Sequence, residues 1–396
     1  MSDETKASAT VSDYLRWRSD LTFAQDGFNE VDNLLLCIIS YIKLENIPRL
    51  RSFDPKDAMP MGDVCRLLTE EDEQLGLSTL DYIPLMRQAA ETPRFREVSL
   101  FAFESLHDED RQMQFAAVSF LLPDGSVYAA YRGTDMTIVG WQEDFNMSFL
   151  SAVPAQVKAA EYAGAVARAC PRRALRIGGH SKGGNLAAWA AVHLDEKLQR
   201  QRLIAAYNND GPGFSRDLVD TPSYQAVADR LFTYIPASSI VGVLLEHAED
   251  YEVVDSTARS IMQHEPLSWC VEGPRFVHLG QRSQLGQLSD GVLREWIGSM
   301  SSREREQFSR AFFDILSRGG RTKTLEDLRS GGLAAGAALI REYAGADEEK
   351  KKIISEIFRR LAVDVKDELM KAAGAGVRRA GESILATGQA IADLRK

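Results

Sequence analysis

The sequence contains few cysteines, and none of them lies close to another. The four are spread over 396 residues with no CxxC pair: Cys37, Cys65, Cys170 and Cys270. A disulfide framework or a zinc site needs clustered cysteines, or cysteines grouped with histidines, so we expect neither. We expect reduced and mostly buried thiols instead, as in a cytoplasmic protein.

An excess of positive charge and long apolar runs are lacking as well. The formal net charge is −10, whereas a nucleic-acid-binding protein normally presents a basic face, so we expect no nucleic-acid partner. No run of about 18 apolar residues could span a membrane. The first residues, MSDETKASATVSDYLRWRSD, are polar and acidic and contain no signal-peptide core. These absences predict a cytoplasmic globular protein.

Length and composition indicate more than one folded unit. Hydrophobic residues make up 44% of the chain and charged residues 26%, which is ordinary for a protein with a substantial core. At about 150 residues per domain, the length suggests roughly two to three units. We predict a flexible N-terminal tail over residues 1–27, an α/β domain over residues 28–290 and a helical region over residues 291–396.

Strand and helix patterns alternate in the middle of the chain. Two strands, Phe115–Leu122 and Ser126–Tyr131, are joined by a Pro-Asp-Gly turn. The alternation predicts a mostly parallel sheet with helices on both faces. Helices are predicted at Phe28–Ile47, Pro154–Cys170 and Asn185–Leu194, and further strands at ALRIGG (174–179), RLIAAYN (202–208), RLFTYIP (230–236) and DYEVVDS (250–256).

The C-terminal region carries an apolar helical stripe opposite a charged face. We expect this stripe to pack on the main body or on another helix. Peripheral contact with a membrane or a protein partner is the alternative. The stripe consists of Ile353, Ile354, Ile357, Phe358, Leu361, Val365 and Leu369.

The segment RIGGHSKGGNLAAWAA (176–191) connects a strand pattern to a helix pattern. It is not a P-loop, because Ser181 precedes Lys182 and the glycine spacing differs, and it does not fit G-x-G-x-x-G. It fits G-x-S-x-G over Gly179–Gly183. That motif presents a serine at a strained strand-to-helix turn, where a Cβ on either glycine would collide with its neighbours. Because the helix N-terminus also favours the negative charge of the attack, Ser181 is the predicted nucleophile.

Several motifs resemble those of a known family. The stretches FNEVDNLLL, YRGTD, GHSKGGNLA, NNDGPGF and LLEHAEDYEVV are similar to a bacterial group of class-3-lipase-like α/β-hydrolases, commonly described as a domain of unknown function. The resemblance covers Phe28–Leu279 and implies an α/β-hydrolase-like fold. It also implies that Thr134, after Arg-Gly, and the backbone N–H of Lys182 bind the oxyanion. His264, in IMQHEPLSW, is then the general base.

The acid of the expected triad departs from the family pattern. Where class 3 lipases carry an aspartate, the stretch YIPASSIVG has Ser239. Asp210, after the strand that follows the nucleophile helix, is the favoured replacement, and Asp250, closer in sequence to His264, is the alternative. Asp210 fits an Asx turn nearly as well, and Asp250 fits a solvent-facing residue at the start of a strand.

The remaining histidines receive weaker roles. His247 is the only rival base, and His180, beside the nucleophile, is expected to be a packing residue. We expect solvated or structural roles for His107 and His193. His278 shows no acid signature nearby.

Together these motifs predict a serine hydrolase of carboxylic esters, of the lipase, phospholipase or esterase type, with an acyl-enzyme on Ser181. Its substrate would be a small acyl ester or a lipid, and the chemistry needs no metal or organic cofactor. We expect the Lys182 side chain to be a surface charge, with attraction of an anionic substrate as the alternative, and Asp135 and Asp144 to brace the oxyanion loop. The alternative functions are a binding or scaffold protein, supported by the missing acid, and a thioesterase or peptidase.

Overall fold

The computed structural model describes residues 8–69, 82–134, 138–247, 249–283, 286–287, 296, 299–318, 343, 345, 348, 350–357 and 359. The chain forms two compact units, and each is discontinuous in sequence. Unit 1 comprises residues 1–135 and 154–282, and unit 2 comprises residues 136–153 and 283–396.

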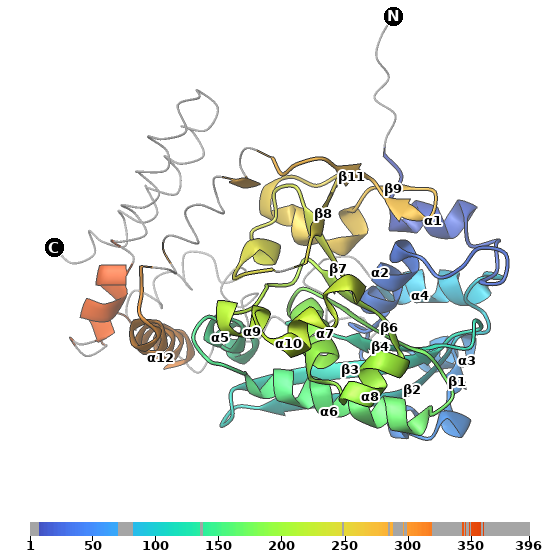
Figure 1. The fold of residues 1–396 in the computed structure, drawn as a ribbon, viewed down its shortest axis with the longest axis horizontal. Coiled ribbons are helices and arrows are strands. Elements are labelled where there is room, and N and C mark those ends of the chain that lie inside the picture. The colour runs from blue at the N-terminus through green and yellow to red at the C-terminus, as the bar shows by residue number, and fades with distance from the viewer. Residues whose placement is uncertain are drawn as a thin grey trace, which may run out of the picture. The chain divides into compact units, whose positions relative to one another are not determined.

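Among the described residues of unit 1, nine strands form one sheet in the order β1-β2-β3-β4-β5-β6-β7-β8-β11 (Figure 1). The strands from β4 to β8 are parallel, and antiparallel strands flank them on both sides. A short hairpin, β9–β10, lies outside this sheet. The strands are β1 Met59–Pro60, β2 Ser99–Asp108, β3 Met113–Leu121, β4 Val127–Tyr131, β5 Leu175–His180, β6 Leu203–Asn209, β7 Leu231–Pro236, β8 Tyr251–Val254, β9 Val271–Glu272, β10 Arg275–Phe276 and β11 His278–Leu279.

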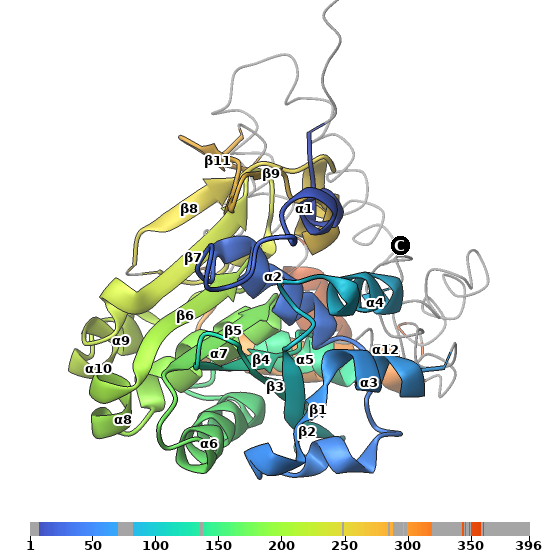
Figure 2. The ribbon, with the colours of Figure 1, turned by 90° about the vertical axis from the view of Figure 1, so that its right-hand side faces the viewer.

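Helices cover both faces of the sheet (Figures 1 and 2). Residues separated by an odd number of positions in a strand point to opposite faces. On β4, Tyr128 donates a 2.6 Å hydrogen bond to Asn33 Oδ1 of α2 (Glu30–Ile39), whereas Tyr131 donates a 2.7 Å bond to the Ala159 carbonyl of α6 (Pro154–Ala169). The predicted α/β-hydrolase-like architecture is therefore confirmed. The other helices of unit 1 are α1 Val11–Trp17, α3 Met61–Leu67, α4 Tyr82–Glu91, α7 Lys182–His193, α8 Glu196–Gln201, α9 Arg216–Val219 and α10 Pro222–Gln225.

The N-terminal segment is not a flexible tail, so that prediction is wrong for its described part. Helix α1 lies within it, and its residues Val11 and Tyr14 are fully buried. A helix of seven residues is too short to be recognised from apolar spacing, and its stability comes from tertiary packing. Residues 1–7 of the predicted tail lie outside the described residues.

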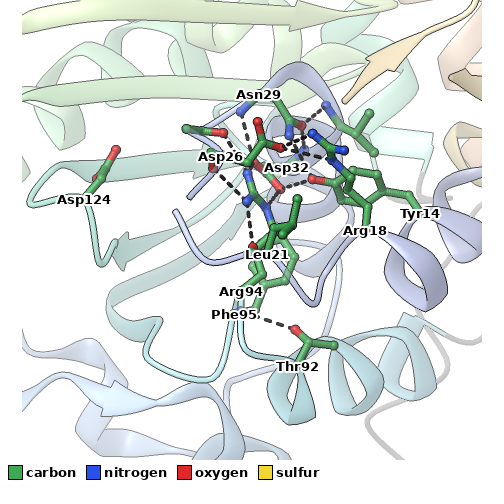
Figure 3. A network of polar contacts seen from close by, with 12 residues as sticks. Tyr14, Arg18, Leu21, Asp26, Asn29, Asp32, Thr92, Arg94, Phe95 and Asp124 are labelled. Carbon is green, nitrogen blue, oxygen red and sulfur yellow. Dashed lines mark hydrogen bonds and ion pairs between the residues drawn. The ribbon is translucent and has the colours of Figure 1, made fainter. Parts of the chain in front are cut away.

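A buried ion pair joins α2 to the segment after α4, and the N-terminal segment contacts it through hydrogen bonds (Figure 3). Arg94 and Asp32 are both fully buried, and Arg94 Nη2 lies 2.5 Å from Asp32 Oδ2. The Tyr14 hydroxyl donates to Asp32 Oδ1 at 2.9 Å. Arg94 also donates to the carbonyls of Leu21 and Asp26 at 3.0 and 2.9 Å. These bonds satisfy the buried charges, as burial of an ion pair requires.

All four cysteines are buried free thiols, as the sequence predicted. Of the described residues, no helix combines the length and apolar character needed to cross a membrane.

Unit 2 joins a short insertion to the C-terminal region. Helices α5 (Ile138–Asn146) and α12 (Ser302–Arg318) belong to it. Its hydrophobic core contains Met300, Phe308, Ala311, Ile354 and Ile357, with Phe145, Trp296, Phe312, Tyr343 and Ile353 packed against them.

The domain prediction also differs from this division around the sheet. The predicted boundary at residue 290 lies close to the start of the second segment of unit 2, but the inclusion of residues 136–153 was not foreseen. Three members of the predicted apolar stripe, Ile353, Ile354 and Ile357, pack in the core of unit 2. Its remaining predicted members, Phe358, Leu361, Val365 and Leu369, lie outside the described residues.

Candidate active site

Ser181 lies at the sharp turn between β5 and α7. Its backbone has φ 59° and ψ −134°, a strained conformation for a residue with a side chain. A Cβ on Gly179 would overlap the backbone of Gly183, and a Cβ on Gly183 would overlap the carbonyl of Tyr131. The predicted strain and the need for both glycines are confirmed.

Asp210 follows the adjacent parallel strand, so its side chain starts from the same edge of the sheet as Ser181. His180 pairs with Asn209 in the sheet, and the Ser181 N–H donates to the Asn209 carbonyl at 2.9 Å. Asp210 has φ 53° and is fully buried. Ser181, after β5, and Asp210, after β6, therefore lie at the same ends of two neighbouring strands.

His264, at the end of the 3-10 helix Ser260–His264, contacts this carboxylate directly. Its Nδ1 lies 2.6 Å from Asp210 Oδ2. The His264 side chain is 18% exposed while that of Asp210 is 0% exposed. An Nδ1–H that donates to the carboxylate leaves Nε2 unprotonated, which is the tautomer that a general base needs.

The carboxylate of Asp210 accepts two further hydrogen bonds. The Ser239 hydroxyl donates to Oδ2 at 2.6 Å, and the Gly242 N–H donates to Oδ1 at 3.1 Å. Ser239, at the position where the family pattern has the acid, therefore contacts the carboxylate that lies beside His264.

Asp250, the alternative acid, lies elsewhere. It is exposed and directly precedes β8. Because β6, β7 and β8 are parallel, the start of β8 lies at the opposite edge of the sheet from the end of β6, where Asp210 is found. The structure thus brings Asp210, and not Asp250, to His264.

The segment predicted to bind the oxyanion packs against the nucleophile. A Cβ on Gly133 would lie 3.0 Å from Ser181 Cβ and 2.6 Å from the His180 carbonyl. Thr134, the next residue, is buried, and Lys182 is the first residue of α7. Asp135 lies outside the described residues, and Asp144 belongs to α5 in unit 2, so their bracing role stays a prediction.

The Lys182 side chain is not a surface charge, so that expectation is wrong. It is buried, and its Nζ donates to the Gln114 carbonyl of β3 at 2.9 Å. Every residue of α7 from Lys182 to Val192 is buried. Because the helix begins inside the fold, its first side chain reaches a neighbouring strand instead of solvent.

His247 is held by hydrogen bonds at both ring nitrogens. Its Nε2 lies 2.7 Å from the Gly242 carbonyl and its Nδ1 lies 3.2 Å from Glu249 Oε1. Burial raises the pKa of Glu249, but the hydrogen bonds and charge of His247, together with Thr233 and Tyr224, outweigh this and bring it to about 2. His247 thus has both nitrogens occupied by structural partners and does not contact Asp210 through its own ring.

His278 and His193 have partners other than Ser181, Asp210 and His264. His278 has carboxylates on both sides, Glu30 at 2.9 Å and Glu252 at 3.1 Å, which the sequence around it did not indicate. Burial lowers its pKa, but these two partners outweigh burial and raise it. His193 stacks on Trp189, with the ring centroids 3.9 Å apart. His107 is exposed on β2.

Two further side chains contact the site and were not predicted. His180 was expected only to pack, but its Nε2 lies 2.8 Å from the His264 carbonyl. The hydroxyl of Tyr41, a residue that no motif singled out, lies 3.0 Å from His180 Nδ1. Tyr41 and His180 are 139 positions apart, so no local spacing could have indicated the contact.

This sheet, with a strained serine turn after β5, defines a lipase-like α/β-hydrolase fold. The chain belongs to the Mbeg1-like family, whose model matches residues 89–314, more than half of its length. The narrower resemblance to bacterial class 3 lipases stays a prediction.

Two solved structures are similar to this chain. The first, a native Rhizomucor miehei lipase propeptide complex, is 16% identical, with 44% of this chain and 72% of that chain covered and a TM-score of 0.33. The second, Lip2 lipase from Yarrowia lipolytica, is 14% identical, with 63% of this chain and 91% of that chain covered and a TM-score of 0.35. No curated protein matches the chain.

Proposed function

We propose that this protein is a serine hydrolase of carboxylic esters, acting on a small acyl ester or a lipid. The observation that carries the proposal is the 2.6 Å hydrogen bond between His264 Nδ1 and the buried carboxylate of Asp210. This carboxylate directly follows β6, and the adjacent parallel strand β5 ends at a serine whose backbone has the strained geometry of a nucleophile turn. This combination of nucleophile, base and acid is the one that acyl transfer requires.

Each side chain has a defined part in the reaction. The Ser181 hydroxyl oxygen attacks the acyl carbon while its proton passes to His264 Nε2, and Asp210 stabilises the imidazolium. Thr134 and the Lys182 N–H stabilise the oxyanion of the tetrahedral intermediate. The intermediate then collapses, the proton passes from His264 to the departing alkoxide, and the acyl group stays on Ser181. Water, activated by His264, releases the acid.

The binding or scaffold alternative rested on a missing acid. Asp210 supplies a carboxylate at hydrogen-bonding distance from His264, and that support therefore falls away. A thioesterase or a peptidase would use the same residues, so the substrate panel of the test has to include a thioester and an amide. We also propose a cytoplasmic location, supported by the four buried free thiols.

The test is active-site labelling with a fluorophosphonate probe, followed by ester hydrolysis assays. We expect the wild type to be labelled and the Ser181→Ala and His264→Ala variants to lose labelling and hydrolysis to a similar extent, because triad members act as a unit. Asp250→Asn is the matched control and should behave as the wild type. Equal labelling of wild type and folded Ser181→Ala would overturn the proposal.

A further inference from the structure

The hydroxyl of Tyr41 lies between the predicted oxyanion segment and the nucleophile turn. Tyr41 follows α2 and is only 3% exposed. Gly133 packs closely against this hydroxyl, because a Cβ on Gly133 would overlap it. On its other side, the hydroxyl lies 3.0 Å from His180 Nδ1 and 3.3 Å from the His180 carbonyl.

The tautomer of His180 follows from its partners. Its Nε2 lies 2.8 Å from the His264 carbonyl, which can only accept, so Nε2 must carry the proton. Burial lowers the pKa of His180, and the neighbouring His264 lowers it further, so the ring is neutral. Its Nδ1 is therefore an acceptor, and the Tyr41 hydroxyl donates to it. The Tyr41–His180 bond and the His180–His264 bond then each have one donor and one acceptor.

We propose that Tyr41 and His180 are positioning residues that connect the backbone of the oxyanion segment at Gly133 to the backbone of the base at His264. This inference rests on the proposed function. The chain of contacts runs from the backbone of Gly133 to the Tyr41 hydroxyl on which it packs, from that hydroxyl to His180 Nδ1, and from His180 Nε2–H to the His264 carbonyl. Hence the geometry of the oxyanion donors and that of the base are fixed by one shared pair of side chains.

The chemistry gives this connection a purpose. The oxyanion donors and the base act on the same tetrahedral carbon, and tolerances of about 0.5 Å separate productive from unproductive geometry. Asp210 fixes the ring of His264 through Nδ1 but does not hold its backbone. The His180 ring, with its centroid 4.6 Å from that of His264, holds the backbone and, being neutral, adds no positive charge beside the imidazolium that forms.

A purely structural role is the competing explanation, because any buried hydroxyl with partners contributes to stability. Tyr162 provides the matched control for it. Its hydroxyl is fully buried, donates to the Ala102 carbonyl at 2.7 Å and lies 2.9 Å from the Ser119 hydroxyl. Tyr162→Phe removes a comparable pair of contacts without touching Gly133, His180 or His264.

The first experiment compares Tyr41→Phe with Tyr162→Phe, using an ester substrate and a boronic acid that forms a tetrahedral adduct with the active serine. We expect Tyr41→Phe to lower kcat roughly 10- to 100-fold with KM changed less than about twofold. Its affinity for the boronic acid should fall in parallel with kcat, because the adduct resembles the transition state. Tyr162→Phe should lower the Tm by a similar amount but leave kcat and boronic acid affinity unchanged.

The second experiment changes His180 and does not depend on the folding of the Tyr41 variant. In His180→Gln the side-chain amide keeps a donor for the His264 carbonyl, whereas His180→Leu has none. We expect the Gln variant to retain kcat within roughly tenfold of the wild type and the Leu variant to lose roughly 100-fold or more. Equal kcat in the two variants would overturn the inference.

Failure of this inference can be told apart from failure of the proposed function. If the wild type hydrolyses esters through Ser181 but Tyr41→Phe keeps its kcat and boronic acid affinity, Tyr41 is only structural and the inference is wrong. If wild type and Ser181→Ala label equally with the fluorophosphonate probe, the proposed function itself is wrong.

Discussion

At the scale of single residues, the most informative feature is the carboxylate of Asp210. Its Oδ2 lies 2.6 Å from both His264 Nδ1 and the Ser239 hydroxyl, and it is fully buried. A buried carboxylate is stable only when its oxygens are well supplied with donors. Ser239 provides one of them from beyond the end of β7, and Asp210 supplies the charge from the end of β6.

We therefore expect Asp210→Asn and Ser239→Ala to differ in kcat by orders of magnitude. Asn cannot stabilise the imidazolium and can donate toward Nδ1, which favours the wrong tautomer, so kcat should fall by about 10³- to 10⁴-fold. Ser239→Ala keeps the carboxylate and loses one donor, so a loss of about tenfold is expected. Steady-state kinetics checks both, with Asp250→Asn as the control. Full activity of Asp210→Asn together with inactivity of Asp250→Asn would reassign the acid.

Local patterns explain why the elements around Ser181 were predictable from sequence. The predicted strands over residues 115–122 and 126–131 match β3 and β4 within two residues at each end, and the helix predicted at Pro154–Cys170 matches α6 within one. The two strands are nearly continuous apolar runs, which agrees with their almost complete burial, and the buried residues of α6 recur at helical spacing. The need for glycine on both sides of Ser181 could also be predicted, because it follows from the geometry of the turn itself.

Contacts between distant segments explain what the sequence did not reveal. Tyr41 meets His180 from 139 positions away, and the Tyr82 hydroxyl donates to Glu265 from 183 positions away. Lys182 was expected at the surface because a charge normally is, yet β3 supplies a carbonyl for it inside the fold. Neither secondary-structure propensity nor motif spacing indicates which distant segments contact each other in the fold.

At the scale of elements, Glu249 connects β7, α10 and the segment before β8. Its carboxylate accepts bonds from Thr233 of β7 and Tyr224 of α10, both at 2.5 Å, and lies 3.2 Å from His247 Nδ1. Burial acts against this charge, but the partners outweigh it and bring the pKa to about 2. A carboxylate with a depressed pKa stabilises the fold above the pKa of the unfolded chain.

The sign of the resulting pH dependence can be stated. In the unfolded chain the Glu249 pKa is near 4.5, so the unfolded state binds more protons between about pH 5 and pH 2. The free energy of unfolding should therefore fall by about 3 kcal/mol on acidification through that range. Glu249→Gln should remove this component, as measured by urea unfolding at several pH values. Asp250→Asn, an exposed neighbour, should keep the wild-type slope, and an unchanged slope in Glu249→Gln would contradict the assignment.

At the scale of the whole molecule, the two units are interleaved in sequence. Residues 136–153, between β4 and α6, belong with the C-terminal region and not with the sheet. Within unit 2, the Ser309 hydroxyl donates to Asn146 Oδ1 at 2.7 Å, and Arg305 donates to the Ser148 carbonyl. Truncation of the chain at the predicted boundary, residue 290, would therefore remove the packing partners of residues 136–153.

The core of unit 2 depends on Phe308, which is 3% exposed. Its ring centroid lies 5.3 Å from those of Phe145 and Phe312 and 6.1 Å from that of Trp296. Replacing a buried phenylalanine with alanine typically costs about 3–5 kcal/mol, because the cavity is only partly refilled. Since α5 and α12 share this contact, the loss should destabilise both helices at once.

We therefore expect Phe308→Ala to lower amide hydrogen-exchange protection in α5 and α12 together, while β5 and α7 keep theirs. Hydrogen exchange followed by mass spectrometry, resolved by peptide, measures this directly. Arg310→Ala is the matched control, because Arg310 lies on the same helix in an exposed ion pair with Glu306 and such pairs contribute little. If α5 keeps its protection when α12 loses it, then residues 136–153 do not depend on the C-terminal region, and the predicted boundary near residue 290 would separate two independent domains after all.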